Sequence, residues 1–358
     1  MSIIVSAAHE IQLATNQAEA FFESHWPRKI CLADPVFSEW QFSAPPIAGG
    51  NNHSMVAFDT HTRDIVGIMG LNPRPFYFRG DKVQGAELTS WVVAPSQRGT
   101  GVGARIIAEI QNRYQVLIGM GISSMALPIY RRSGFRYIRA IPRFIRVINE
   151  DTTSTFGSIS SLGKKLQNRI TPLRYKYSER DISFEDGLFE RMHKTFSLFD
   201  RGPEHLAWRY TNHPSFTYNT RIIACDGGEA LVVYRIEDAV SGLRVMHIMD
   251  CIGDSNAMSA ALSYIEDLAI SENVDFIDSY STSACLNRFY LAHEWSSIID
   301  DDAVQVPHLF HPVELRNPPT TSLIYWAKER MLDMADLGHL YVSKQDADLD
   351  RPVPLYSG

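Results

Sequence analysis

The sequence APSQRGTGVG, from Ala94 to Gly103, decides the fold, because it places a glycine-rich turn between a predicted strand and a predicted helix. The preceding strand, ELTSWVV, spans Glu87 to Val93 and is rich in β-branched residues. The following helix, VGARIIAEIQ, repeats isoleucine at helical spacing. Glycines allow a close backbone approach, and the first amides of a helix attract anions. The turn is therefore predicted to hold a phosphate.

The glycine spacing excludes two other phosphate-binding motifs. Gly99, Gly101 and Gly103 follow the pattern G-x-G-x-G, whereas the dinucleotide fingerprint requires G-x-G-x-x-G with an acidic residue on the next strand. The lysine of a Walker motif is also missing. A glycine turn by itself also occurs as an ordinary connection between strand and helix, so a second element is needed to support a binding function.

The strand VLIGMG, from Val116 to Gly121, and the segment SSMALPIYRRSGF, which ends at Phe135, supply that second element. With the turn, they resemble the GNAT superfamily of acyl-CoA N-acyltransferases. The family loop reads R/Q-x-x-G-x-G/A, and its later helix reads N-x-x-A-x-x-L-Y-x-x-x-G-F. These patterns are filled by Arg98, Gly101, Gly103, Ala126, Tyr130, Gly134 and Phe135. Ser123 departs from the pattern, because it stands where the family often carries the asparagine that meets the pantetheine arm.

The resemblance implies that residues 1–148 bind acyl-CoA, with acetyl-CoA or 3-hydroxybutyryl-CoA as the co-substrate and without a metal. The strand before the turn would offer backbone groups to the pantetheine and an amide to the thioester oxygen. The cofactor-binding residues expected on this basis are Trp91, Val93, Arg98, Gly99, Thr100, Gly101, Val102, Gly103, Ala104 and Ser123.

Two residues are candidates for proton transfer. By its family position, Tyr130 would donate a proton to the departing CoA thiolate. Alternatively, its ring packs in the core and its hydroxyl is satisfied there. Glu87 lies where many family members place a carboxylate that removes the proton of the amine, directly or through water. A glutamate at the end of a strand is alternatively a solvated charge.

Composition favours an enzyme of the cytoplasm. The chain has 358 residues and a net charge of −7, which disfavours a nucleic-acid or anionic-membrane partner. Its four cysteines are scattered, as in a reducing compartment. The amino terminus does not read as a signal peptide, and the longest uncharged run is too short to span a membrane.

The order of predicted elements indicates an α/β fold with mixed sheets and two tandem GNAT-like domains. We expect a GNAT domain at 1–148, closed by a strand pair in YIRAIPRFIRVIN. A linker rich in Ser, Thr and Gly follows at 149–178, then a second domain at 179–316 and a carboxyl-terminal extension at 317–358. The second domain repeats the element order but has CIGDSNAM in place of the glycine turn. Its aspartate would repel a pyrophosphate, so this domain is predicted to lack the cofactor.

The whole chain resembles tandem GNAT-like proteins of bacterial surface-sugar pathways, in which WRY-x-x-HP and a carboxyl-terminal D-x-D-x-DRP recur. The second motif is filled by Asp346, Asp348, Asp350, Arg351 and Pro352. The first supplies the expected acceptor-binding residues, which are Trp208, Arg209, Tyr210 and His213. Alternatively, the tryptophan and tyrosine anchor a domain junction and the histidine caps a turn. The acidic tail is expected to be a solvated terminus rather than a metal site.

These expectations combine into one function. The chain is predicted to move an acetyl or short hydroxyacyl group, such as 3-hydroxybutyryl, from CoA to the amine of a nucleotide-linked sugar. The resemblance points to a dTDP-linked aminodideoxyhexose used for O-antigen, lipopolysaccharide or capsule. Two alternatives remain open: acylation of a peptide or protein amine, and a sensor that binds acyl-CoA without turnover.

Overall fold

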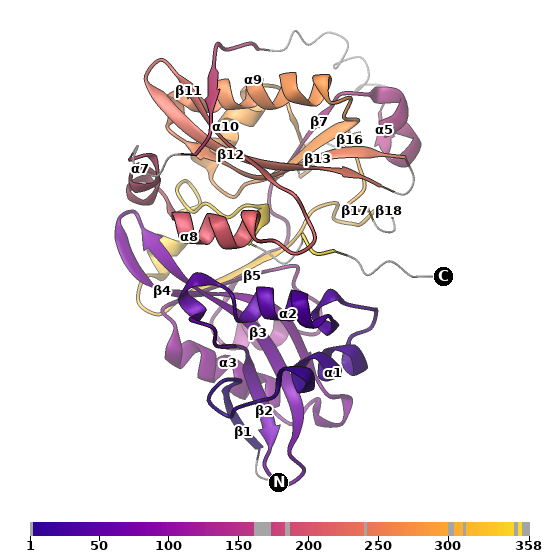
Figure 1. Ribbon diagram of the computed structural model, residues 1–358, viewed down its shortest axis with the longest axis vertical. Coiled ribbons are helices and arrows are strands. Elements are labelled where there is room, and N and C mark those ends of the chain that lie inside the picture. Colours follow the sequence, from indigo (N-terminus) through magenta and orange to yellow (C-terminus); the bar gives the residue numbers. More distant parts are fainter. Residues whose placement is uncertain are drawn as a thin grey trace.

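The computed structural model describes residues 3–160, 173–182, 187–239, 242–299, 304–310, 313–346 and 350–352. Two large mixed β-sheets form two bodies stacked along the long axis, and the described chain begins at the far end of the first body (Figure 1). Helix α8 (Pro203–Leu206) and carboxyl-terminal segments lie between them. The expected α/β architecture with two sheet-containing bodies is confirmed.

The first sheet has the order β1-β2-β3-β4-β5-β19-β6, and β10 pairs additionally with β3. Its central parallel pair is β4 and β5, which flank the glycine turn and helix α3 (Val102–Arg113). The strands are β1 (Ile3–Ala7), β2 (Met55–Asp59), β3 (Asp64–Phe78), β4 (Asp81–Val93), β5 (Val116–Met120), β6 (Arg136–Ile138), β10 (Ser197–Phe199) and β19 (Leu323–Ala327).

Helices cover both faces of the first sheet. The isoleucines of α3 pack on one face together with α4 (Leu127–Arg132), in a core that includes Leu88 and Tyr130. The aromatic side chains of α1 (Thr15–His25) and α2 (Pro35–Phe42) pack on the other, in a core that includes Val92. Two separate apolar cores therefore hold β4 from either side.

The second sheet has the order β15-β7-β14-β13-β12-β11-β9. Helix α9 (Ser255–Ser271) covers one face, with α10 (Ala284–Ala292) packed beside it (Figure 1). The strands are β7 (Arg143–Val147), β9 (Ser178–Arg180), β11 (Asn219–Cys225), β12 (Gly228–Asp238), β13 (Arg244–Gly253), β14 (Phe276–Tyr280) and β15 (Ser296–Ser297).

The two sheets exchange strands. We expected 137–149 to close the first body as a strand pair, but only β6 lies in the first sheet, whereas β7 pairs with β14 in the second. In return, β19 from the carboxyl-terminal extension lies between β5 and β6. The side chain of Arg143 on β7 is fully buried and contacts Asp278 of β14 at 2.9 Å. Each body therefore needs a segment from the other half of the sequence, and the expected boundary at 148 does not separate the sheets.

Part of the expected linker at 149–178 forms regular secondary structure. Its first residues form helix α5 (Glu150–Phe156), and β8 (Ser158–Ile159) pairs with β16 (Val304–Gln305). The stretch 161–172 lies outside the described residues. Helix α7 (Leu188–Thr195) then packs on the core of the second body and leads into β10 of the first sheet. Elsewhere, β17 (Leu309–Phe310) pairs with β18 (Val313–Glu314), and α11 (Met331–Met334) follows β19.

The expectation of a solvated acidic tail is wrong. Asp346, at the end of the short helix η5 (Lys344–Asp346), is fully buried, and Asp350 is 4% exposed. Asp350 forms an ion pair with Arg235 of β12 at 2.6 Å. Asp348 lies outside the described residues. Because buried carboxylates require partners, Asp346 and Asp350 face arginines rather than water, which the composition of the segment did not indicate.

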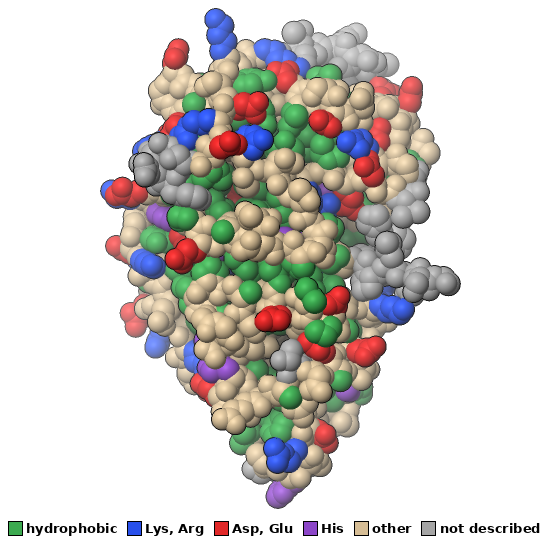
Figure 2. Space-filling model, in the orientation of Figure 1, with side chains coloured by type: hydrophobic (Ala, Val, Ile, Leu, Met, Phe, Trp, Pro, Cys, Tyr) green, Lys and Arg blue, Asp and Glu red, His purple; other side chains and the backbone are tan. Residues whose placement is uncertain are grey.

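Charged side chains of both signs are interspersed over the face of the molecule drawn in Figure 2. Among the described helices, none combines the length and the apolar character needed to cross a bilayer.

The Asp346 contacts predict a large stability effect. Asp346 contacts Arg74 at 3.1 Å and Arg201 at 2.6 Å. Asp346→Ala would leave both arginines buried without their shared carboxylate, which costs about 3–5 kcal/mol in similar buried pairs. We expect the free energy of unfolding in urea to fall by this amount. Asp333→Ala is the control, because it removes an exposed ion pair with Arg330 and should cost less than about 1 kcal/mol. Equal losses in the two variants would contradict the role given to Asp346.

Candidate functional site

A β-bulge interrupts β4 at the point where the sequence predicted a ligand. Leu88 pairs with Leu71 and Trp91 pairs with Met69, so two residues of β4, Thr89 and Ser90, lie opposite Gly70 alone. A side chain at position 70 would collide with Thr89 and Phe42, so glycine is required there. The extra residue turns the strand, because it shifts the alternation of side chains between the two faces of the sheet.

The bulge coincides with the end of the parallel pairing between β4 and β5. The last paired residues are Leu88 and Gly119, and no described strand pairs with residues 89–93 on the β5 side. Arg98 Nε donates to the carbonyl oxygen of Val93 at 3.2 Å, which folds the arginine back over the end of the strand. The remaining backbone edge can therefore bind an extended ligand.

The glycine turn continues this edge toward α3. Gly99 and Gly101 have positive φ angles of 80° and 90°, and a Cβ at either position would meet open space. Gly101 is the N-cap, and no side chain caps the first turn of the helix. The amides of Val102, Gly103 and Ala104 thus lie at the positive end of the helix, while Thr100 donates to the carbonyl oxygen of Gln97 at 2.7 Å. These features suit an anion.

Gly103 permits the close packing of Trp91. A Cβ on Gly103 would lie 2.8 Å from Cζ2 of the indole, which is closer than side chains tolerate. The indole also packs edge-on against Tyr130, with ring centroids 5.2 Å apart. Its Nε1 is buried and has no hydrogen-bond partner among the described residues. Trp91 therefore ties the unpaired strand edge to α3 and α4.

Tyr130 lies in the core with 2% of its surface exposed. Its hydroxyl contacts Sδ of Met69 at 3.9 Å, and its ring packs against Phe135. Met69 pairs with Trp91, so the hydroxyl points toward the strand end where the pairing with β5 has ceased. The expected core packing is present, and the acid role remains a prediction.

Ser123 is exposed, and its Oγ accepts from the amide of Ala126 at 3.2 Å.

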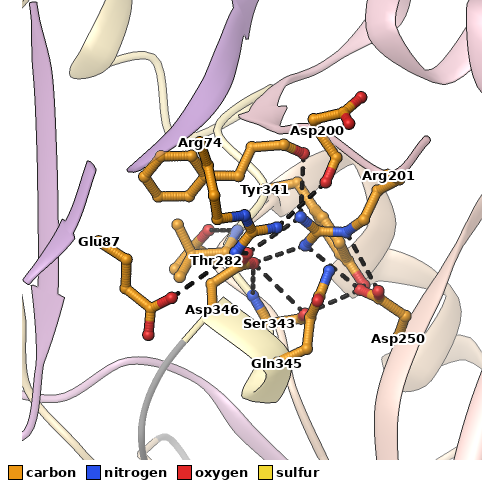
Figure 3. A network of polar contacts seen from close by, with 12 residues as sticks. Arg74, Glu87, Asp200, Arg201, Asp250, Thr282, Tyr341, Ser343, Gln345 and Asp346 are labelled. Atoms are coloured by element: carbon orange, nitrogen blue, oxygen red, sulfur yellow. Dashed lines mark hydrogen bonds and ion pairs between the residues drawn. The ribbon is translucent and has the colours of Figure 1, made fainter. Parts of the chain in front are cut away.

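Glu87 is buried rather than solvated. Its side chain is 5% exposed, and Oε2 lies 3.8 Å from Nη1 of Arg74, which also contacts Asp346 at 3.1 Å (Figure 3). The same side of β4 carries Ser90, whose Oγ accepts from Nη1 of Arg351 at 2.6 Å. Glu87 and Ser90 therefore face the carboxyl-terminal segment, whereas Trp91 and Tyr130 lie on the α3 side.

The network in Figure 3 joins both bodies through buried charges. Asp346 accepts from Arg74 and, through both oxygens, from Arg201 at 3.0 and 2.6 Å. Arg201 also contacts Asp250 of β13 at 3.1 Å. The neighbouring arginines lower the pKa of Asp346 despite its burial, so the carboxyl is ionised. No sequence pattern indicated Arg74 or Arg201, and the motif containing Asp346 was interpreted as solvent-exposed.

The tryptophan of the WRY segment anchors the two bodies to each other. Trp208, in the turn η4 (Ala207–Thr211), donates from Nε1 to the carbonyl oxygen of Trp40 at 2.8 Å. Trp40 returns the same bond to Trp208 at 3.0 Å, and the rings stack with centroids 5.2 Å apart. Trp208 is therefore an anchor at the domain junction, which was the alternative to a role in acceptor binding.

The other three expected acceptor residues also have partners in the protein. Tyr210 donates to Asp250 at 3.2 Å, and Arg209 donates to the hydroxyl of Tyr218 at 3.3 Å. His213 caps a turn, because its Nδ1 accepts from the amides of Ser215 and Phe216. Burial lowers the pKa of His213 to about 3, so the ring is neutral. Arg209 and Trp208 nevertheless line a small cavity together with Glu87.

The second sheet repeats the framework of this site. Its central strand β13 runs parallel to β14 through Ile248, after which Met249 forms a bulge against β12. Tyr290 occupies the position of Tyr130, because the amide of Trp295 bonds to its carbonyl oxygen as the amide of Phe135 bonds to that of Tyr130. The two bodies therefore share the bulge, the diverging strand pair and the tyrosine.

The chain itself occupies the corresponding strand edge in the second body. The hydroxyl of Tyr341 accepts from the amide of Cys251, which corresponds to Trp91 in position after the bulge. At the start of α9, the carboxylate of Asp254 accepts from the amide of Glu229 and from Arg191 at 2.9 Å. A protein group thus occupies the strand edge, and a carboxylate lies at the helix start without bonding to the first amides of α9. In the part of the chain that the structure describes, no cluster of His, Cys, Asp or Glu could hold a metal ion.

Comparisons with known proteins agree with this geometry. Residues 6–138 match the family model of the acetyltransferase (GNAT) domain, and no curated protein matches the chain. Among solved structures, a GCN5-related N-acetyltransferase from Anabaena variabilis is 13% identical with a TM-score of 0.56, covering 90% of this chain and 72% of that chain.

Two further structures have the same fold. A GCN5-related N-acetyltransferase from Kribbella flavida is 13% identical with a TM-score of 0.54, covering 91% of this chain and 72% of that chain. An N-myristoyltransferase from Saccharomyces cerevisiae, with bound myristoyl-CoA, is 12% identical with a TM-score of 0.53, covering 91% and 79%. At these identities the likeness shows the fold, and it includes both bodies. The family match to the acetyltransferase (GNAT) domain is thus to residues 6–138 of the first body.

Proposed function

We propose that this chain, whose residues 6–138 form a GNAT acetyltransferase domain, transfers a short acyl group from CoA to the amine of a nucleotide-linked amino sugar. The observation that carries the proposal is the contrast between the two bodies. The unpaired edge of β4 beside the uncapped start of α3 would take acyl-CoA, whereas in the second body the hydroxyl of Tyr341 occupies the strand edge and the carboxylate of Asp254 lies at the start of α9.

The acyl donor would bind along β4. The amides at the start of α3 and the glycine turn would hold the pyrophosphate, and the strand edge from Thr89 to Val93 would pair with the pantetheine amides. A backbone amide at the bulge would stabilise the thioester oxygen as it becomes negative. One donor of this kind contributes about 3 kcal/mol to catalysis. Either an acetyl or a 3-hydroxybutyryl group is compatible with this arrangement.

Proton transfer would use the two faces of β4. The amine attacks the thioester carbonyl and loses a proton to Glu87, directly or through one water, on the side of the carboxyl-terminal segment. The carbon–sulfur bond of the intermediate then breaks, and Tyr130 protonates the departing thiolate from the α3 side. Arg74 lies beside Glu87 and favours its ionised form, as a base requires.

A sugar amine requires less from the base than a lysine does. If the sugar amine titrates like an α-amino group, with a pKa of about 8, roughly a tenth is neutral at pH 7, and the base needs to supply only about 1.4 kcal/mol. A lysine, with a pKa of about 10.4, would require some 4–5 kcal/mol. The alternatives are acylation of a protein amine and CoA binding without turnover. The following variants distinguish both of them from the proposed reaction.

Tyr130→Phe tests the acid role. We expect free-thiol release to slow about a hundredfold while the affinity for acetyl-CoA stays within twofold, because only the hydroxyl is lost. Tyr290→Phe is the matched control, since this tyrosine holds the same position in the closed body. Unchanged turnover in Tyr130→Phe would rule out the acid role. If the wild type releases no thiol with any amine, the alternative of a sensor that binds acyl-CoA without turnover is favoured.

Glu87→Gln tests both the base and the acceptor. With an amino-sugar acceptor, we expect kcat/KM to fall about tenfold at pH 7 and less than twofold at pH 9, where an amine of pKa about 8 is already neutral. Glu39→Gln, at an exposed position on α2, is the control. A loss that persists at pH 9, or preferred acylation of a lysine peptide, would contradict the sugar assignment.

A further inference from the structure

We propose that a cavity of about 250 Å³ on the open face of the second sheet binds a single sugar ring of the acceptor; this inference rests on the proposed function. The cavity lies between strands β12 and β13 and the carboxyl-terminal segment. Its lining includes Phe216, Arg235, Glu237, His247, Tyr280 and Lys344.

The cavity lies next to the reaction centre. Arg351 and Asp350 line it, and both also line the smaller cavity beside Glu87. Arg351 contacts Ser90 at the bulge of β4 through Nη1 at 2.6 Å. The edge of the cavity is therefore within the length of one arginine side chain of the bulge, where the thioester would lie. A ring bound here can present a substituent to Glu87.

The volume limits the size of the ligand. A water molecule occupies about 30 Å³ in the liquid, so 250 Å³ corresponds to about eight waters. Pockets for drug-sized ligands measure about 300–1,000 Å³. The cavity therefore suits one ring, while the nucleotide of a nucleotide-linked sugar would remain outside it.

Three basic side chains that line the cavity face carboxylates of the protein. Arg235 contacts Asp350 and Glu237, each at 2.6 Å. His247 lies between Glu237 at 3.1 Å and Asp278 at 2.6 Å. Lys344 contacts Asp278 at 3.1 Å. Because Arg235, His247 and Lys344 each already face a carboxylate, these three side chains do not select a phosphate or an ammonium group.

The same floor suits a ring with hydroxyl groups. Hydroxyls both donate and accept, and the cavity offers carboxylate oxygens beside guanidinium and ammonium donors. Aromatic side chains form part of the wall: Phe216 stacks on Arg235 with the guanidinium 4.2 Å from the ring centroid, and Phe310 packs against His247. Burial lowers the pKa of His308 on the wall to about 3, so it is neutral. A lysine side chain has neither the ring nor the hydroxyls that would use these groups.

Saturation-transfer NMR with D-glucosamine tests the proposal without turnover, and n-butylamine serves as a mimic of the lysine side chain. We expect saturation of the glucosamine ring protons by the wild-type protein, at least fivefold less in Phe216→Ala, and no specific signal from butylamine. Phe289→Ala is the matched control, because Phe289 is also partly buried under an arginine but lies outside the cavity. Ser215→Phe, at an exposed position on the wall, fills the cavity and should also lose the signal.

The outcomes separate this inference from the proposed function. Equal glucosamine signals in the wild type and in both cavity variants, or none in the wild type, would overturn the sugar site even if amino sugars are acylated. Loss of the signal in Phe216→Ala and Ser215→Phe but not in Phe289→Ala supports the site. If acetyl-CoA then releases no thiol with any nucleotide-linked amino sugar, the transfer reaction fails while the cavity assignment stands.

Discussion

Asp346 holds the molecule together at a point where four distant parts of the sequence meet. Its carboxylate lies between Arg74 of the first sheet and Arg201, which in turn contacts Asp250 of the second sheet (Figure 3). Buried charges are costly unless they are paired, so the position of each group depends on the others. Because Arg74 also contacts Glu87, the interaction that joins the bodies also sets the surroundings of the candidate base.

The exchanged strands also join the two bodies through the backbone. β7 completes the second sheet and β19 completes the first, so neither body contains all of its strands within one half of the sequence. The reciprocal bonds between Trp40 and Trp208 lie at the same junction. A site between the bodies is consequently built on fixed elements rather than on a mobile hinge, which suits a reaction that needs two substrates held in attack geometry.

Sequence reasoning correctly placed the elements whose pattern lies within a short stretch of the chain. The strand before the glycine turn, the turn and α3 are where the pattern of glycines and isoleucines placed them, and Tyr130 lies beside Trp91. Sequence reasoning missed the contacts between residues that are far apart in the sequence. Arg74 and Asp346 are separated by 272 positions, and no local pattern marks either as buried. Composition alone predicts that an aspartate-rich segment is solvated. Only the fold shows the arginines that this segment faces.

The central claim is that acyl-CoA binds one body and is excluded from the other by the chain itself. Hydrogen exchange with and without acetyl-CoA, combined with calorimetric titration, tests it most directly. The account predicts one acetyl-CoA per chain and slowed exchange at the amides of residues 89–93 and 99–104. Two molecules per chain, or slowed exchange at Cys251 and the start of α9 instead, would contradict it.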